Sequence, residues 1–169
     1  MGGLCSPDVA NPYAGIFEQR TVTKYPNNNV LMYVRYIDDI FMIVLGDSEG
    51  EAMKFCPFKI GPLCLEWSAS DITIHFLDVK VFVMPGTSEI RYKLYRKPRN
   101  HYSPIPWRCS PPKHIKKAVP NGEMSRLTTC SSHREYYIAA SDEFRGALKA
   151  HSWPTQVLHT WYKEPLSKR

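Results

Sequence analysis

The stretch VRYIDDIFMIV, residues 34–44, places two adjacent aspartates in the middle of an apolar run. The flanking segments, residues 30–37 and 40–45, are rich in the β-branched and aromatic residues that favour strands. Two such runs separated by Asp38 and Asp39 predict a tight β-hairpin with these two residues as its turn. Neighbouring carboxylates repel one another, so an adjacent pair of aspartates favours the binding of a cation between or beside them.

Magnesium is the natural ion for such a pair of carboxylates. Mg²⁺ takes hard oxygen ligands and commonly joins one or two carboxylates to substrate phosphates. Two such ions would stabilise the attacking and leaving oxygens of a phosphoryl transfer. A solvated Asp-Asp turn that binds no ion is the alternative, and these two residues alone do not exclude it.

Charge is divided unevenly along the chain. Residues 1–90 contain 6 Lys/Arg and 11 Asp/Glu, a net of −5, whereas residues 91–169 contain 16 Lys/Arg and 5 Asp/Glu, a net of +11. A strongly basic half predicts contact with a polyanion such as nucleic acid. A solvated basic face is the alternative explanation.

Other global features narrow the class of protein. No run of 18 apolar residues occurs, which predicts no membrane span, and the first residues lack the pattern of a secretory signal. The five cysteines are odd in number and scattered, so we expect reduced thiols in an intracellular protein. Cys130 and His133 form the only closely spaced Cys/His pair, which does not favour structural zinc.

In the first half we predict helices, strands and turns from local pattern. A helix is expected over residues 7–20, weakened by Pro12, and a short helix over residues 48–55, with Ser48 as cap and Glu51 at the capping-box position. Further strands are expected at residues 63–70, 72–84 and 89–97, where β-forming residues alternate with polar ones.

The character of the chain changes near Pro98. Residues 98–112 contain five prolines and predict an extended linker. Helices are expected beyond it, and the first two, joined at Pro120-Asn121-Gly122, predict a helix-turn-helix-like unit. The sequence therefore predicts an α+β protein with an acidic, sheet-rich domain at residues 1–97 and a basic helical domain at residues 98–169. The expected helices cover residues 112–119, 122–130, 132–151 and 154–164.

Six segments, taken in order, resemble the reverse transcriptases of Penelope-like retroelements. Tyr-x-Asp-Asp between two hydrophobic strands is the signature of the active-site hairpin of these enzymes. The resemblance implies that residues 1–97 are part of the polymerase palm, an antiparallel sheet, and that residues 98–169 are the thumb. The six segments are MGGLCSPDVANPY (1–13), YIDD (36–39), HFLDVKV (75–81), YKLYRKPRNHYSPI (92–105), PPKHIKKAVPNGEMSRLTTCSS (111–132) and WPTQVL (153–158).

The resemblance also implies roles for individual residues. Asp38 would be a catalytic metal ligand, and Asp39 would share or support the same site. Tyr36 would lie near the primer end. The remaining residues expected beside the nucleotide or primer are Gly2, Gly3, Ser6 and Pro7 of the glycine turn, and Phe76, Leu77 and Asp78 at the position of the primer grip.

The basic half would hold the primer–template duplex through its backbone. Thumb helices of this kind follow a duplex by its shape and phosphates rather than by its bases. An ordinary charged surface is the alternative. The residues expected to contact phosphates are Arg91, Lys93, Arg96, Lys97, Arg99, Lys113, Lys116, Lys117 and Arg126.

The implied activity is that of an RNA-directed DNA polymerase, a nucleotidyltransferase. It would use Mg²⁺, dNTPs and an RNA/DNA primer–template duplex, in the nucleus for the parent element. The family needs another metal-binding aspartate and fingers upstream of the glycine turn, whereas this chain begins inside that motif. We therefore expect a fragment that is inactive alone and lacks an upstream polymerase half. The alternatives are a non-catalytic nucleic-acid-binding helix-turn-helix module and the remnant of a decayed element.

Overall fold

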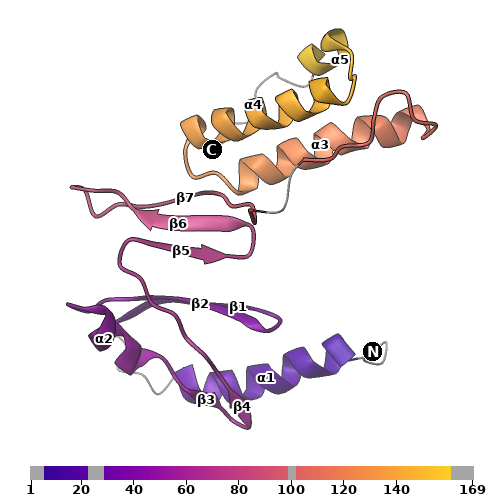
Figure 1. Cartoon of the computed structure of the whole chain (residues 1–169). Coiled ribbons are helices and arrows are strands. Elements are labelled where there is room, and N and C mark those ends of the chain that lie inside the picture. The colour runs from indigo at the N-terminus through magenta and orange to yellow at the C-terminus, as the bar shows by residue number, and fades with distance from the viewer. Residues whose placement is uncertain (1–5, 23–28, 99–101, 161–169) are drawn as a thin grey trace. The chain divides into compact units, whose positions relative to one another are not determined.

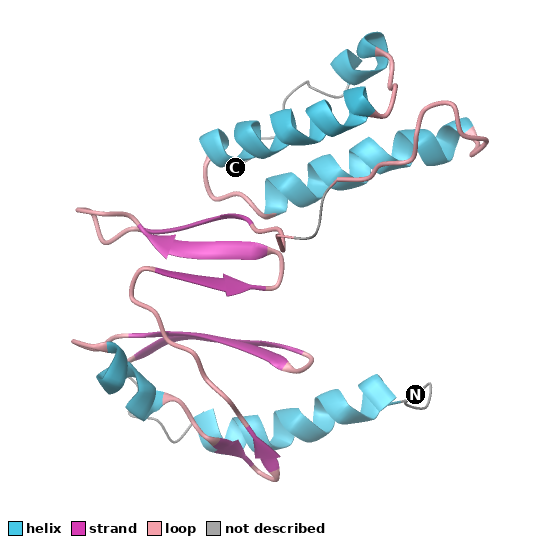
Figure 2. Cartoon of the chain, viewed as in Figure 1, coloured by secondary structure: helices cyan, strands magenta, loops and turns pink. Residues whose placement is uncertain are grey.

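The computed structural model describes residues 6–22, 29–98 and 102–160. These residues form five α-helices and three small antiparallel sheets (Figure 1, Figure 2), which confirms the predicted α+β class. The chain divides into two compact units, residues 1–74 and 75–169. This division differs from the predicted boundary at residues 97 and 98, because the last sheet belongs to the same unit as the long helices. The palm and thumb assignments stay predictions.

The first unit combines a long helix with short strands. Helix α1 (Ser6–Val22) continues through Pro12, which lies in its second turn and removes one intrahelical hydrogen bond without ending the helix. The hairpin β1 (Val30–Tyr36) and β2 (Asp39–Val44) follows it. The remaining elements are α2 (Glu49–Ala52), the 3₁₀ turn η1 (Met53–Phe55), and the two-residue strands β3 (Lys59–Ile60) and β4 (Leu63–Cys64).

The predicted cap of the short helix α2 is confirmed. Ser48 Oγ accepts a hydrogen bond from the Glu51 backbone N–H at 3.2 Å. The Glu51 carboxylate accepts in return from the Asp47 N–H at 2.8 Å, one residue before the usual capping-box partner. Of the strand predicted over residues 63–70, only Leu63–Cys64 is a strand.

The first unit packs around few buried side chains. Among its described residues, only Ala14, Pro57 and Ile60 are buried. Gly61, in the β3–β4 turn, has a φ of +60° and lies against the Phe17 ring of α1, so any side chain there would overlap that ring. This core is small, and polar contacts between α1 and β1 add to the packing of the unit.

The second unit begins with a three-stranded sheet in the order β5-β6-β7. Its strands are β5 (Thr73–Phe76), which crosses the boundary between the units, β6 (Val79–Val83) and β7 (Ile90–Leu94). The prediction of one strand over residues 72–84 is therefore wrong. The chain reverses at Leu77-Asp78, because Leu77 adopts a positive φ of 50° and allows a two-residue turn.

Two antiparallel helices follow the sheet, α3 (Lys113–Thr129) and α4 (Arg134–Ala150), and then the short α5 (Thr155–Thr160) (Figure 1). Helix α3 is continuous, so the predicted pair of short helices joined at Pro120-Asn121-Gly122 is wrong. A proline inside a helix costs about 3 kcal/mol. Here Pro120 is fully buried, and its packing offsets part of that cost. The turn between helices lies instead at residues 130–133.

The proline-rich stretch does not act as a free linker where it is described. The Trp153 indole N–H donates to the Ile105 carbonyl at 2.8 Å, and the Trp107 N–H donates to the His151 carbonyl at 3.1 Å. The Trp107 and Trp153 rings lie 5.1 Å apart. This stretch thus packs on a core that contains Phe144, Leu148, Trp153 and Leu158.

Ser132 joins the helical hairpin to the free edge of β7. Its N–H and its hydroxyl both donate to the Tyr92 carbonyl at 2.9 Å, and its Oγ accepts from the Tyr92 N–H at 3.1 Å. An edge strand exposes unpaired backbone groups that can pair with other chains. Ser132 satisfies two of these groups and fixes the connection between α3 and α4 against the sheet.

Replacing Ser132 by alanine should therefore destabilise the second unit. Ser132→Ala leaves the Tyr92 N–H without its partner, and we expect the free energy of unfolding to fall by about 1–2 kcal/mol. Urea denaturation followed by far-UV circular dichroism measures this change. Ser125→Ala, at an exposed position of α3, is the matched control and should be neutral or slightly stabilising. Equal effects of the two substitutions would contradict this role of Ser132.

Candidate functional site

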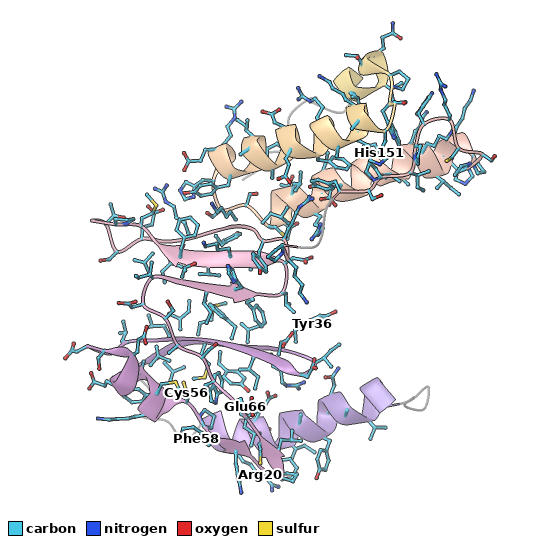
Figure 3. The ribbon with its side chains drawn as sticks, in the orientation of Figure 1. Arg20, Tyr36, Cys56, Phe58, Glu66 and His151 are labelled. Atoms are coloured by element: carbon cyan, nitrogen blue, oxygen red, sulfur yellow. The ribbon has the colours of Figure 1, made fainter. Side chains whose placement is uncertain are left out.

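The Tyr-Ile-Asp-Asp segment forms the closed end of the β1–β2 hairpin. The strand register pairs Tyr36 with Asp39, so the turn consists of Ile37 and Asp38. The predicted turn at Asp38-Asp39 is wrong by one residue, because Asp39 already pairs as the first residue of β2. Tyr36, labelled in Figure 3, lies beside this turn, and its side chain and both aspartates are exposed.

Ile37 holds a strained backbone conformation at this turn. Its φ is 57°, in a region that β-branched residues rarely adopt. Only the first of the two turn residues has a positive φ, as in a type II′ turn, where glycine is the usual residue. Such strain persists only where surrounding contacts hold it. One of these contacts is the hydrogen bond from Arg35 Nη1 to the Ile37 carbonyl, at 2.8 Å.

Arg35 connects this turn to helix α1. Its Nε donates to Glu18 Oε1 at 2.6 Å, and Tyr33 donates to the same oxygen, also at 2.6 Å. Arg35 Nη1 also donates to Asn11 Oδ1 at 2.9 Å. The Arg35 and Glu18 side chains are 16% and 14% exposed, so solvent screens this ion pair little. Sequence analysis missed this network. The signal that could have found it is the arginine within an apolar strand, because a charged side chain at such a position needs a partner.

The two aspartates offer an incomplete set of ligands for a metal ion. Within the described part of the chain, no group of three or more His, Cys, Asp or Glu side chains could hold a metal. Two exposed carboxylates fit an ion that keeps most of its waters and shares substrate phosphates, as Mg²⁺ does. They do not fit an ion that protein ligands enclose. The catalytic and metal-binding roles of Asp38 and Asp39 stay predictions.

The other residues expected near nucleotide and primer lie in several places. Gly2 and Gly3 are outside the described residues, and Ser6 and Pro7 form the first turn of α1. Phe76 ends β5, and Leu77 and Asp78 form the β5–β6 turn of the second unit. Among them, Asp78 accepts a hydrogen bond from Arg126 Nε at 3.0 Å, so this carboxylate has a partner within its own unit.

Three of the arginines expected to contact phosphates are held by carboxylates. Arg91 binds Glu89 at 2.8 Å and Glu135 at 3.4 Å. Arg96 and Arg126 both bind Glu123 at 3.2 Å. Each ion pair lowers the positive charge that the surface offers to a polyanion.

The lysines expected to contact phosphates are mostly free of such partners. Lys93, Lys97, Lys113 and Lys117 are exposed and have no ion pair among the described residues. Lys116 differs, because its ammonium donates to the Trp107 carbonyl at 2.6 Å. Arg99 lies outside the described residues. Lysines therefore carry most of the available positive charge of this set.

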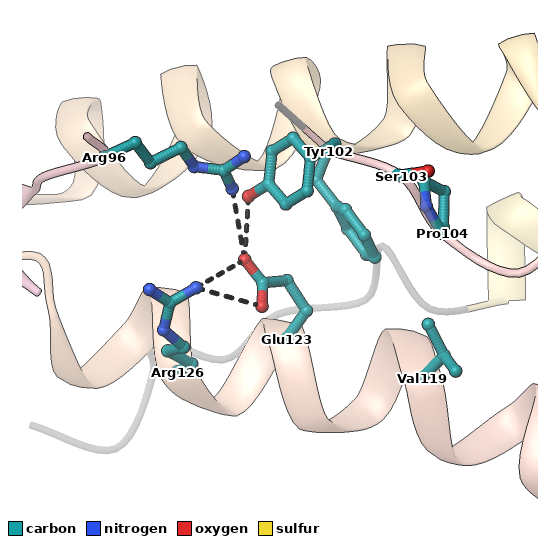
Figure 4. A pocket seen from close by; sticks show the side chains of 8 residues that line it. Arg96, Tyr102, Ser103, Pro104, Val119, Glu123 and Arg126 are labelled. Atoms are coloured by element: carbon teal, nitrogen blue, oxygen red, sulfur yellow. Dashed lines mark hydrogen bonds and ion pairs between the residues drawn. The ribbon is translucent and has the colours of Figure 1, made fainter. Parts of the chain in front are cut away.

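The Glu123 cluster, formed by Arg96, Tyr102, Glu123 and Arg126, lines a pocket of about 240 Å³ in the second unit (Figure 4). Tyr102 donates to Glu123 Oε1 at 2.8 Å, and the Arg96 guanidinium lies over the Tyr102 ring. Burial lowers the pKa of Arg96. The hydrogen bond that Arg126 donates to Asp78 raises the pKa of Arg126. Val119 and Phe144 contribute apolar surface to the same pocket.

We found no family model, no curated protein and no solved structure that matches the chain significantly. No helix within the described segments is long and apolar enough to cross a membrane. Functional inference therefore depends on the residues and their geometry.

The strain at Ile37 predicts an unusual response to glycine. Ile37→Gly should leave the free energy of unfolding unchanged or raise it by up to about 1 kcal/mol, because the relief of a positive φ offsets the entropy that glycine adds to the unfolded chain. Ile40→Gly, at a regular position of β2, should lower it by more than about 1 kcal/mol. Urea denaturation compares the two, and an equal loss in both variants would contradict a strained turn.

Removing the charge of Glu123 should destabilise the second unit. Glu123→Gln leaves two partly buried guanidinium groups without their carboxylate, and we expect a loss of about 1–3 kcal/mol in the free energy of unfolding. Glu135→Gln is the matched control, because the Glu135 side chain is 63% exposed and solvent screens its ion pair with Arg91, so its loss should change stability little. Thermal unfolding of both variants tests the difference, and similar midpoints would contradict a central role for Glu123.

Proposed function

We propose that this chain is part of an RNA-directed DNA polymerase similar to those of Penelope-like retroelements. The observation that carries the proposal is the hairpin itself. Two exposed aspartates lie at a strained two-residue turn between apolar strands, and the Arg35 network joins that turn to α1. Strained backbone of this kind often occurs at functional sites. The Leu77-Asp78 turn has a similar positive φ, but there Arg126 binds the aspartate, whereas Asp38 and Asp39 lie side by side and exposed at the hairpin turn.

The residues of the hairpin would have different roles in binding the metal ion and the nucleotide. Asp38 and Asp39 would supply carboxylate oxygens to Mg²⁺, which when bound stabilises the negative charge on nucleotide phosphates. Arg35 is a positioning residue, because it contacts the Ile37 carbonyl next to Asp38. The exposed ring of Tyr36 offers apolar surface beside the carboxylates.

The charge of the second unit favours the proposal that it would bind a nucleic-acid duplex. Residues 75–169 contain 17 Lys/Arg and 7 Asp/Glu, a net of +10. Exposed lysines along β7 and α3 would contact phosphates without reading bases. Such binding weakens steeply as salt concentration rises.

A non-catalytic nucleic-acid-binding module is the second candidate function. It is favoured by the incomplete ligand set, since the described residues bring no third metal-binding side chain to Asp38 and Asp39. The two candidates differ in one respect. Only the polymerase proposal requires a divalent ion at the hairpin.

Substitution of the aspartates tests this requirement. Asp38→Asn and Asp39→Asn should each weaken Mn²⁺ binding on the order of tenfold, because each removes a charged oxygen ligand. Electron paramagnetic resonance of Mn²⁺, used as the probe in the presence of dNTP and primer–template, measures the change. Any Mg²⁺-dependent primer extension by the wild-type chain should also disappear in both variants.

Two controls define the outcomes. Asp71→Asn, in an exposed loop of the first unit, should bind Mn²⁺ as the wild type does. Duplex affinity without metal, measured by fluorescence anisotropy, should not fall in any of these variants. If Mn²⁺ binds equally to all variants while the duplex is still bound, the polymerase proposal fails and the binding module stands. If the wild-type chain binds no duplex, both candidates fail.

A further inference from the structure

Two lysines lie directly opposite one another in the sheet of the second unit. The β6–β7 register pairs Lys80 with Lys93. Side chains at directly opposite positions project from the same face, with Cβ atoms about 5 Å apart, and like charges there destabilise the sheet. Among the described residues, neither lysine ammonium group forms a hydrogen bond or an ion pair.

Carboxylates that could neutralise these lysines are already engaged. The next pair along the strands, Phe82 and Arg91, shares the same face because directions alternate along a strand. Arg91 binds both Glu89 and Glu135, the two glutamates near this end of the sheet. Asp78, two residues before Lys80 on the same face, binds Arg126. No carboxylate of the described residues therefore forms an ion pair with Lys80 or Lys93.

Aromatic rings orient one of the two ammonium groups. Lys93 Nζ lies 5.8 Å from the centre of the Phe82 ring and 6.0 Å from the centre of the Tyr136 ring of α4. These rings contact each other edge to face, with centroids 5.7 Å apart. A cation held over aromatic faces loses less freedom when it binds an anion. Lys93 is exposed, so a ligand can reach it from solvent. Lys80 is half-buried, so neighbouring side chains restrict its motion.

We propose that Lys80 and Lys93 form a clamp for backbone phosphate of the nucleic-acid duplex. This inference rests on the proposed function and names the part of the second unit that grips the polyanion. Phosphate oxygens would lie between the two ammonium groups and relieve their repulsion. Contacts of this kind carry no sequence information, so the clamp holds any duplex. Sequence analysis placed Lys93 among the phosphate contacts but missed Lys80, because only the register brings the two together.

The double variant Lys80→Gln/Lys93→Gln tests the clamp. We expect duplex affinity in about 0.1 M salt to fall on the order of tenfold, and the slope of log K against log salt to become shallower by about two. The unfolding midpoint of the same variant should rise, because the cross-strand repulsion is gone. Fluorescence anisotropy with two duplexes of unrelated sequence, at several salt concentrations, measures affinity, and both duplexes should lose equally.

Three further variants complete the experiment. Lys80→Glu should raise the unfolding midpoint further, through a cross-strand ion pair, and should also lose affinity. Lys80→Arg/Lys93→Arg keeps both charges and should bind within about twofold of the wild type. Lys149→Gln, at an exposed position near the end of α4, should likewise change affinity less than about twofold.

The outcomes separate the clamp from the proposed function. A wild-type affinity and salt slope in the Lys80→Gln/Lys93→Gln variant would overturn the clamp and leave duplex binding intact. Loss of binding with a lowered unfolding midpoint in every Lys80 and Lys93 variant, arginines included, would assign these lysines a structural role and also overturn it. If the wild-type chain binds no duplex at all, the proposed function fails, and the clamp fails with it.

Discussion

The carboxylate of Glu123 organises the second unit, because it joins segments that are far apart in the sequence. It binds Arg96 just after β7, Tyr102 in the proline-rich stretch and Arg126 one turn further along α3. Through Arg126 the contacts reach Asp78 in the β5–β6 turn. Buried charges are stable only when they are paired, so these contacts constrain the sheet, the extended stretch and the helix together.

This arrangement also decides which cations remain for a ligand. Arginine forms bidentate contacts with carboxylates and suits partly buried ion pairs, whereas lysine keeps a hydrated point charge at the surface. The second unit follows this division, since Arg91, Arg96 and Arg126 bind carboxylates while Lys93, Lys97 and Lys117 are exposed. A surface of lysines suits a polyanion that is held through its backbone and released by salt.

Two turns in the chain share one local geometry and differ in their surroundings. Tyr-Ile-Asp and Phe-Leu-Asp each place an aliphatic residue with positive φ just before an aspartate, at Ile37 and Leu77. Arg126 binds the second aspartate, Asp78, which becomes an anchor within its unit. Both aspartates are exposed, but the carboxylate of the first, Asp38, has no ion-pair partner among the described residues and lies beside Asp39, so it is available to a cation. Local sequence therefore determines the turn geometry, whereas the neighbouring elements determine whether the aspartate in the turn binds an arginine of the chain or remains available to a ligand.

The sequence by itself determined the α+β class, the β1–β2 hairpin, the cap at Ser48 and the helical character of the basic half, because these depend on propensity and on hydrophobic period over a few residues. Tertiary structure decided the rest. Burial let α3 continue through Pro120, and cross-strand pairing moved the hairpin turn to Ile37-Asp38 and set Lys80 opposite Lys93. The contacts of Arg96 with Glu123 and of Arg126 with Asp78 span 27 and 48 residues. No local rule includes the energy of contacts between residues so far apart in the chain.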